Sequence, residues 1–592
     1  MKSHFLVPVL SILSLSTISY ATENQLDDVV VTATKTAISA DQSIVPVVVI
    51  TADDIEKSPA MDLPGLLSGT AGINIASAGG FGQQTSLFVR GTNSTHTLVI
   101  IDGVKVGSLS SGFTALEHIS LDQIERIELI KGSRSSLYGS DAIGGVLQIF
   151  TKKGSGDVSG FHPAVTIGAG SNDTNKVGFS VSGGMGGFTL GMNGVVFHTG
   201  GIDATLESNF NNDPDEDKYN NDSISLNIGK LWNNGVKLDL LYMNSNGEVE
   251  YDGGNFRSDI KNSLNSLKLY VPASDKLDVT LQISESVDDL TSFGAWDSRN
   301  KSRRRQQNLQ TDYYVTDLFQ VSFGLERQQD KLNSSNYADQ KTKSQSRYFQ
   351  GLFDSEMVGV LVGFRHDDYG NYGDEDTWNI GARLNISDSI KLTANNGTAF
   401  KAPNFNQMFW PGGGNPDLLP EKSRSYEIGA AYQTKQMQLQ LNMYRTKVEN
   451  LISGWPSSNI NRAQISGEEL IVNLTNNRIA DLAIELSHVD SRDKASGERL
   501  LKRPIKSAKV TVAKEIGAVD IALTAIGYSS SLGWGGTESA GYGVFNGAVN
   551  YALNDHVKFS LKGENLFDKE YSPVYGYSSK GRSFMLEMKA GF

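Results

Sequence analysis

The sequence lacks several features that would mark other classes of protein. It contains no cysteine, which excludes disulfides, thiolate metal sites and cysteine nucleophiles. It has only 14 prolines, too few for a disordered, proline-rich chain. Beyond the first two dozen residues, no apolar run reaches the about 18 residues that a membrane helix needs. A bundle of transmembrane helices is therefore excluded.

The sequence also lacks an excess of positive charge. It has 53 basic and 66 acidic residues, a net charge of -13. The one dense basic cluster, residues 299–305, is too short for a nucleic-acid-binding face, so no nucleic-acid partner is expected. The phosphate-loop, zinc-protease and serine-hydrolase motifs (GxxxxGK[ST], HExxH and GxSxG) are absent. We therefore expect neither an enzyme nor a catalytic cofactor.

The N-terminus predicts export from the cytoplasm. Lys2 provides a positive charge, residues 5–15 are largely apolar, and residues 19–21 (SYA) form a small-x-small cleavage site. This order is typical of a signal peptide, here residues 1–21. The alternative is a buried N-terminal helix.

Residues 38–152 are predicted to form a compact α/β domain. Residues 47–50 (VVVI) and 97–101 (TLVII) are continuous apolar runs, typical of strands covered on both faces. Between them, Thr51 is a suitable N-cap for a helix with acidic residues in its first turn. Residues 63–67 predict a second short helix.

From about residue 155 to 592 the pattern changes to strict alternation. Residues 437–443 (MQLQLNM) alternate apolar and polar side chains, and the last strand ends on an aromatic, Phe592. Together with export, such alternation over more than 400 residues predicts an all-β transmembrane barrel. At roughly 20 residues per strand and connection, it would have about 22 antiparallel strands, the size of plugged transporters. Long polar connections are expected at 209–222, 292–305, 411–417 and 533–543.

A β-branched segment follows the cleavage site, within residues 22–37. Such a segment can add as a strand to the sheet edge of a partner protein. The alternative is an ordinary first strand of the α/β domain. The residues concerned are Asp27, Asp28, Val29, Val30, Val31, Thr32 and Ala33.

Several longer motifs resemble a known family. Residues 88–93 (FVRGTN), 98–104 (LVIIDGV) and 127–146 resemble the plug domain of TonB-dependent outer-membrane receptors. In the barrel, residues 400–404 (FKAPN) and 415–423 (NPDLLPEKS) are similar to the same family, as are 565–571 (NLFDKEY).

The resemblance implies a fold, a partner and a source of energy. The α/β domain would plug the barrel lumen, and residues 27–34 would be the TonB box. TonB and its inner-membrane motor proteins would supply energy, since the outer membrane holds no ATP. Charged plug residues would form ion pairs with a polar barrel wall, hydrated enough to break. These residues are Arg90, Arg126, Glu128, Lys131 and Arg134.

Within the family, the subgroup resembled transports cobalamin (vitamin B12). Residues 86–96 (SLFVRGTNSTH), 138–145 (YGSDAIGG) and 574–577 (VYGY) are similar to that subgroup. Two plug loops touch the corrinoid there, the second being one residue shorter here. For each matching position, a solvated loop residue is the alternative interpretation. The matching positions are Gln84, Ser86, Asn93, Ser110 and Ser111.

An acidic segment, residues 212–218 (NDPDEDK), indicates a Ca²⁺ site. Clustered carboxylates suit Ca²⁺, which prefers several oxygen ligands. An EF-hand is excluded because Lys218 stands where glycine is required. The alternative is a solubilising acidic loop. The resemblance implies ligands from neighbouring extracellular loops: Asp203, Asp215, Asp217, Tyr251, Asp252 and Asp259.

The sequence thus predicts a TonB-dependent active transporter of cobalamin or a related corrinoid across the outer membrane. We expect a monomer in outer-membrane lipid that passes its cargo to a periplasmic cobalamin-binding protein. Three alternatives remain: a receptor of the same family for an iron siderophore or haem, a passive porin or adhesin, and a barrel enzyme. The low histidine content, 8 residues, disfavours haem.

Overall fold

The computed structural model describes residues 30–31, 38–39, 42–154, 160–209, 211–254, 256–295, 297–370, 372–476 and 478–592. The predicted signal peptide lies outside the described residues. Within them, no helix combines the length and the apolar character needed to cross a membrane.

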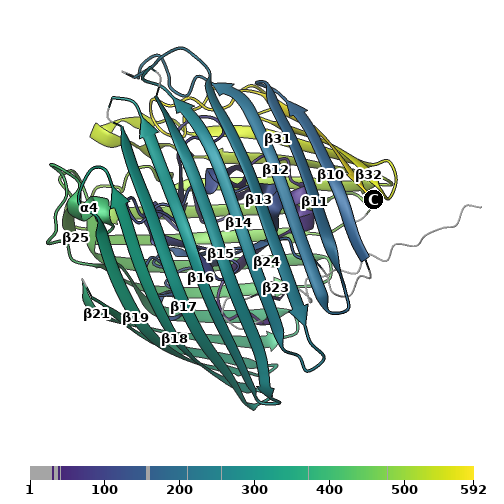
Figure 1. The fold of residues 1–592 in the computed structure, drawn as a ribbon, viewed down its shortest axis with the longest axis vertical. Coiled ribbons are helices and arrows are strands. Elements are labelled where there is room, and N and C mark those ends of the chain that lie inside the picture. Colours follow the sequence, from purple (N-terminus) through teal and green to yellow (C-terminus); the bar gives the residue numbers. More distant parts are fainter. Residues whose placement is uncertain are drawn as a thin grey trace, which may run out of the picture.

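The larger part of the chain forms a closed barrel of 22 antiparallel strands, as the alternating pattern predicts (Figure 1). The barrel closes where β10 pairs with β33, from Ala164 opposite Gly591 to Gly170 opposite Met585. The strands are β10 (Gly160–Gly170), β11 (Thr174–Met185), β12 (Phe188–Ile202), β13 (Asp217–Leu231), β14 (Lys237–Tyr251), β15 (Phe256–Ser274), β16 (Leu277–Phe293), β17 (Ser298–Thr316), β18 (Phe319–Ser334), β19 (Gln340–Asp354), β20 (Val358–Tyr369), β21 (Gly373–Ser387), β22 (Ile390–Lys401), β23 (Glu421–Gln433), β24 (Met437–Ser453), β25 (Ser458–Leu474), β26 (Asp481–Asp493), β27 (Lys506–Ile516), β28 (Val519–Tyr528), β31 (Tyr542–Ala552), β32 (Val557–Glu564) and β33 (Ser583–Gly591).

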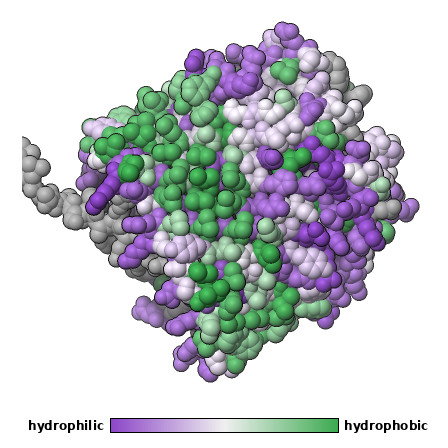
Figure 2. Space-filling model, turned by 180° about the vertical axis from the view of Figure 1, so that it is seen from behind, coloured by the Kyte–Doolittle hydropathy of each residue, from purple (hydrophilic) through white to green (hydrophobic). Residues whose placement is uncertain are grey.

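The alternation in sequence places apolar side chains on the outside of the barrel. In β24, Leu441 and Met443 are exposed while Asn442 and Tyr444 are buried. In β33, Leu586 is 55% exposed. Figure 2 shows such hydrophobic side chains gathered over a large part of one outer face, with hydrophilic ones beyond them. An apolar outer surface over a polar interior is the arrangement that a lipid bilayer requires of a barrel.

The basic cluster at residues 299–305 is not part of a connection, contrary to the prediction. It lies in β17, one of the strands that continue past the apolar zone. Its guanidinium groups face carboxylates of the neighbouring strands, as Arg304 does Asp330 at 3.1 Å. Similarly, β13 already begins at Asp217, inside the polar connection predicted for 209–222. Cross-strand ion pairs allow a polar segment to keep its strand conformation outside the membrane.

The plug lies within the barrel lumen (Figure 1) and is built on a five-stranded mixed sheet of order β3-β8-β9-β6-β7. β6 and β9 are parallel, and the other neighbours are antiparallel. A separate hairpin pairs β4 with β5. The plug elements are β3 (Val47–Thr51), α1 (Ala52–Lys57), α2 (Leu63–Leu67), β4 (Ile73–Ser77), β5 (Thr85–Val89), η1 (Ser94–His96), β6 (Thr97–Ile101), β7 (Val104–Val106), η2 (Leu116–His118), η3 (Leu121–Gln123), β8 (Ile124–Lys131), α3 (Ser135–Tyr138) and β9 (Gly145–Thr151).

The local predictions for the plug are largely confirmed. β6 is buried along its whole length, and α1 begins after Thr51. The Thr51 side chain accepts from the Asp54 amide, while the Asp54 carboxylate accepts from the Thr51 amide at 2.8 Å. β3 differs, because each of its residues is only half-buried. It is the edge of the plug sheet and lines a cavity along the barrel wall, so one of its faces is not covered.

Candidate functional site

The first predicted ligand loop of the plug is accessible. Gln84 is exposed in the turn before β5, and Ser86 is half-buried within that strand. Asn93, the N-cap residue of η1, is half-buried, and its side-chain oxygen accepts a hydrogen bond from Arg503 in the β26–β27 loop. This loop therefore presents polar side chains near the barrel's outer opening.

The second predicted ligand loop, residues 107–113, lies under a barrel loop. A short helix, α4 (Phe405–Phe409), covers it: the Phe405 amide donates to Leu109 O at 3.2 Å, and the Asn406 amide to Ser110 O at 2.9 Å. Ser110 is buried, and its Oγ lies 2.8 Å from Ser108 Oγ. Ser111 is half-buried, with its carbonyl bound by the Asn404 side chain.

Sequence reasoning missed this covering helix, although its start carries a recognisable signal. Asn404 caps α4 by accepting from the Gln407 amide at 2.9 Å, and Gln407 Oε1 accepts in return from the Asn404 amide. This reciprocal arrangement is a capping box, which can be read from residue types three positions apart.

Three of the six predicted metal ligands lie together at the outer rim. Asp215, Asp217 and Asp252 each place a carboxylate oxygen within 4.8 Å of the others. Asp217 and Asp252 are buried, and they join the β12–β13 connection to the β14–β15 connection. The Asp217 carboxylate accepts from the Ala204 amide at 2.8 Å. Asp252 Oδ1 accepts from the Asp213 amide at 3.1 Å, whereas its buried Oδ2 has no partner among the described residues.

The electrostatics of this acidic cluster favour a cation. Partial burial, together with the carboxylates of Asp213 and Asp252, raises the pKa of Asp215. Partial burial and the carboxylates of Asp252 and Asp213 likewise raise the pKa of Asp203. These shifts record the cost of partly burying the carboxylates and of holding like charges together, which a bound divalent cation would offset.

The other three predicted ligands make different contacts. Asp203 accepts from the Asn212 side chain at 3.2 Å. Tyr251 directs its hydroxyl to Ser258 Oγ at 3.2 Å. Asp259 lies on β15, 3.8 Å from Arg257.

A buried ion network fixes the plug to one side of the barrel wall. Arg90 pairs with Glu427 of β23 at 2.6 Å and with Glu469 of β25 at 2.9 Å. Lys131 pairs with the same Glu469 at 3.2 Å, and the Arg90 guanidinium lies over the Tyr444 ring. Arg90 is only 3% exposed. The prediction of hydrated ion pairs is thus wrong for this network, because its charged groups are buried away from solvent.

The remaining charged plug residues act within the plug. Arg126 pairs with Glu128 at 2.9 Å, and Arg134 donates to the Lys131 carbonyl at 2.9 Å. A second buried contact to the wall joins His96 to Glu421 of β23 at 3.0 Å. Buried ionic contacts therefore join the plug to β23 and β25.

Only part of the predicted TonB box lies within the described residues. Val30–Val31 (β1) pairs antiparallel with Ile38–Ser39 (β2). The remaining box residues, namely Asp27, Asp28, Val29, Thr32 and Ala33, lie outside the described residues. The segment near the N-terminus therefore forms a short ladder of its own.

Comparisons with known proteins agree with this architecture. A family model described as TonB dependent receptor-like, beta-barrel, matches residues 161–566, and one for the TonB-dependent receptor plug domain matches residues 39–146. The vitamin B12 transporter BtuB of Photobacterium profundum is 31% identical over 608 residues, covering 99% of this chain and 99% of that protein. The protein of the same name from Vibrio vulnificus is 28% identical, covering 100% of this chain and 98% of that protein.

Solved structures of similar fold include receptors for other cargoes. The ferric enterobactin receptor PfeA of Pseudomonas aeruginosa has a TM-score of 0.81 at 17% identity, covering 93% of this chain and 98% of its own. The copper transporter OprC has a TM-score of 0.80 at 17% identity, covering 92% of this chain and 98% of its own. At such identities the likeness shows the fold alone. The plugged barrel of 22 strands and the two family matches together identify the chain as a member of the TonB-dependent receptors of the outer membrane.

Proposed function

We propose that this receptor actively transports cobalamin or a related corrinoid into the periplasm. The observation that carries the proposal is the 31% identity to a vitamin B12 transporter along nearly the whole of both chains. The cobalamin-type motifs of the plug, including residues 86–96, are part of this similarity and support the proposal.

The architecture supplies the parts that such transport needs. The corrinoid binds at the outer opening, where Gln84, Ser86 and Asn93 are within reach. Ser110 and Ser111 join the site once α4 moves from its present position over their loop. TonB pairs with residues 27–33 by strand addition and pulls on the plug. A periplasmic cobalamin-binding protein then receives the cargo.

The acidic cluster serves in this proposal as a Ca²⁺ site. Asp215, Asp217 and Asp252 provide three hard oxygen ligands, and the unpartnered, buried Oδ2 of Asp252 is an atom that a cation would satisfy. The resemblance implies three further ligands, Asp203, Tyr251 and Asp259. To bind the cation, each of them exchanges its present contact for the cation. Bound Ca²⁺ would order two outer connections and lower the entropic cost of ligand binding.

Calorimetric titration of the detergent-solubilised protein with cyanocobalamin, in Ca²⁺ and then in EDTA, tests both proposals. Tight binding that weakens at least tenfold in EDTA supports the corrinoid and the cation together. Asp252→Asn should abolish the effect of Ca²⁺ while still binding cyanocobalamin. Asp417→Asn, an exposed carboxylate in the β22–β23 loop, is the matched control and should behave as the unsubstituted protein.

The outcomes separate the two proposals. Binding that is indifferent to EDTA keeps the corrinoid and rejects the cation site. No cyanocobalamin binding in either buffer rejects the corrinoid, and ferric siderophores become the next cargo to titrate, because solved relatives of this fold include siderophore receptors.

A further inference from the structure

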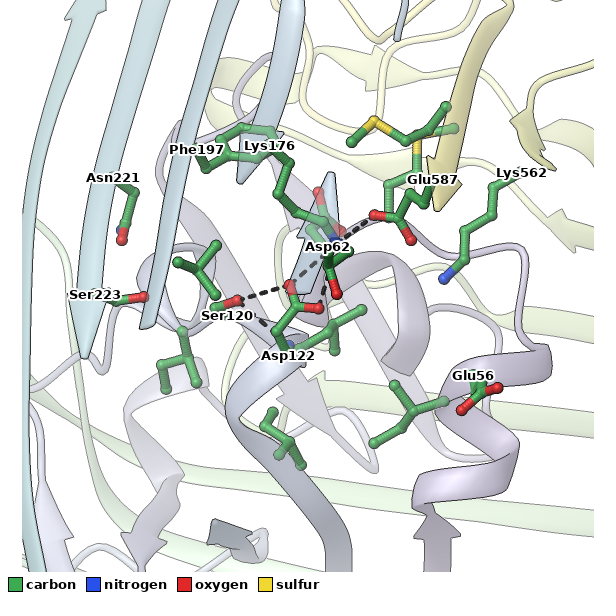
Figure 3. A pocket seen from close by; sticks show the side chains of 18 of the residues that line it. Glu56, Asp62, Ser120, Asp122, Lys176, Phe197, Asn221, Ser223, Lys562 and Glu587 are labelled. Atoms are coloured by element: carbon green, nitrogen blue, oxygen red, sulfur yellow. Dashed lines mark hydrogen bonds and ion pairs between the residues drawn. The ribbon is translucent and has the colours of Figure 1, made fainter. Parts of the chain in front are cut away.

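A cavity of about 270 Å³ separates the plug from one side of the barrel wall (Figure 3). On the plug side it is lined by α1, by Asp62 at the start of α2, and by residues 117–124. On the barrel side it is lined by β10–β13, β32 and β33. The lining reaches from Phe81 and Asn221, toward the outer rim, to Lys558 and Lys589, near the opposite ends of their strands.

The cavity lies where the plug touches the wall only at separate points, such as the bond from Lys562 to the Ala60 carbonyl at 3.1 Å. Against β23–β25, buried ion pairs leave the plug and wall in dry contact, as at Arg90 and Glu469. Along β10–β13, β32 and β33, pairs such as Lys176 with Asp122 bridge the two surfaces, and the cavity lies between these bridging contacts.

Four of the five carboxyl groups that line the cavity already have cationic partners. Glu56 pairs with Lys558 at 2.8 Å. Lys176 pairs with Asp122 at 3.1 Å and also with Glu587. Asp62 lies 3.6 Å from Lys580, outside the cavity lining. Burial raises the pKa of Glu117 to about 8, so its carboxyl group is largely neutral at pH 7.

Three other lysines of the lining, Lys152, Lys562 and Lys589, form no ion pair with a carboxylate of the described chain. Lys562 is buried and donates to the Ala60 carbonyl at 3.1 Å. Figure 3 shows its side chain beside Glu587, outside the ion pairs that join Lys176 to Asp122 and Glu587. Among the described residues, these three lysines have no carboxylate within ion-pair distance, which leaves them available to a phosphate-like group that lysine binds as a point charge.

The size of the cavity limits what it can receive. Pockets that hold drug-sized ligands measure about 300–1,000 Å³. This cavity is smaller, so with the plug in its present position it has room for one polar side of a large cargo and not for the whole molecule. Cobalamin carries a phosphodiester on one side, whereas cobinamide, its precursor-like fragment, does not. The lysines of the cavity and the phosphodiester of cobalamin thus carry opposite charges.

We propose that this cavity is a second, internal binding site, which receives a phosphodiester or similar anionic group of the cargo as it passes the plug. Lys152 and Lys562 hold that group, and the passage opens between residues 117–124 and strands β10–β13, β32 and β33. The identity of the cargo in this inference rests on the proposed transport function. The anion-binding site itself can be tested without any cargo.

The first test measures the electrostatic character of the cavity. Because the chain has no cysteine, Ser560→Cys places one thiol in it. The negatively charged reagent MTSES should modify this thiol at least tenfold faster, relative to the positively charged MTSET, than it modifies Thr511→Cys. Thr511 lies in the cavity along β26–β28, whose lining includes Asp481, Glu485 and Asp520. Adding Lys152→Gln and Lys562→Gln should remove the preference, and equal ratios at both thiols would overturn the proposal.

The second test measures transport in cells. In Lys152→Gln/Lys562→Gln, cyanocobalamin uptake should fall about tenfold while its surface binding stays within twofold, which also reports on folding. Uptake of dicyanocobinamide should be unchanged. The control pair, Lys57→Gln/Lys509→Gln in the other cavity, should transport both corrinoids normally.

Each result has one meaning. Unimpaired cyanocobalamin uptake, or equal loss for both corrinoids, rejects the internal site although corrinoid binding is intact. If the unsubstituted protein binds no corrinoid, the proposal of corrinoid transport fails. The ratios of MTSES to MTSET modification rates then decide alone whether the cavity is an anion-binding site.

Discussion

The hydroxyl of Tyr219 lies 2.9 Å from Nδ1 of His118 and so joins the barrel wall to the plug. Tyr219 follows Asp217 of the acidic cluster by two residues in β13. Its ring packs on Gly82 of the first ligand loop so closely that a Cβ there would lie 2.2 Å from ring carbon Cδ2. In the same region, the Gln83 side chain donates to the Glu250 carbonyl at 2.6 Å. The acidic cluster and the ligand loop are therefore mechanically connected.

This connection predicts that Tyr219→Phe weakens the coupling between Ca²⁺ and ligand. The substitution keeps the ring against Gly82 but removes the partner of the buried His118, at a cost of about 1–3 kcal/mol. We expect Ca²⁺ to improve cyanocobalamin affinity several-fold less in the variant than in the unsubstituted protein, as measured by calorimetry. Tyr242→Phe, on the lipid-facing surface, is the control. An unchanged Ca²⁺ effect in Tyr219→Phe would show that the two sites are independent.

The buried network around Arg90 predicts a large effect from a small change. Glu469→Gln keeps the shape of the side chain but leaves Lys131 as a buried charge without a carboxylate, which typically costs about 3–5 kcal/mol. We expect hydrogen exchange in β8 and in residues 71–73 to accelerate by at least tenfold, because these segments contact the network.

Arg305→Gln provides the comparison for that experiment. Its exposed pair with Glu285 is of the kind worth about 0–1 kcal/mol, so exchange within the plug should not change. Equal exchange rates in Glu469→Gln and the unsubstituted protein would mean that the network does not hold the plug.

The fold was predictable because its signals are local. The two-residue period of a strand determines which side chains face lipid, so residues 437–443 alone predict the outward Leu441 and Met443. The helix start at Thr51 also depends only on residues within one turn.

The interior contacts were not predictable in the same way. Glu427 and Glu469 lie more than 300 residues from Arg90, and their pairing exists only because the plug docks in one orientation. The same is true of α4, which covers Ser110 from a loop almost 300 residues away. The prediction that residues 299–305 belong to a connection was wrong for a different reason. Strand pairing outside the bilayer does not require apolar side chains, so this charged run could form part of β17.

Glu117 predicts an unusual dependence of plug stability on pH. Its Oε2 is buried without a partner among the described residues, and burial raises its pKa to about 8 from the ordinary 4.5. Between these values the folded protein binds a proton that the unfolded chain does not, so the free energy of unfolding falls as pH rises. Glu117→Gln removes this loss.

The variant should therefore match the unsubstituted protein near pH 5 and exceed it at pH 8, by on the order of 1–3 kcal/mol. Thermal unfolding followed at both pH values measures the difference. Burial lowers the pKa of the neighbouring His118 to about 4, which makes both proteins less stable as pH falls below about 6.5. This effect is common to both and cancels in the comparison. A variant less stable than the unsubstituted protein at pH 8 would contradict the prediction.

The ladder between β1 and β2 predicts how substitution in the N-terminal segment affects transport. Val31 pairs with Ile38 through the backbone, and strand addition by TonB would use the same kind of backbone groups. Val31→Pro removes one backbone donor and fixes φ near -65°, so it blocks such pairing without touching the ligand loops. We expect uptake to fall at least a hundredfold while cyanocobalamin binding at the cell surface stays within twofold. Val31→Ala keeps the donor and should transport within a few-fold of the unsubstituted protein. Loss of both binding and uptake in Val31→Pro would instead show that this segment is a structural part of the plug, because a strand needed only for TonB has no role in holding the ligand.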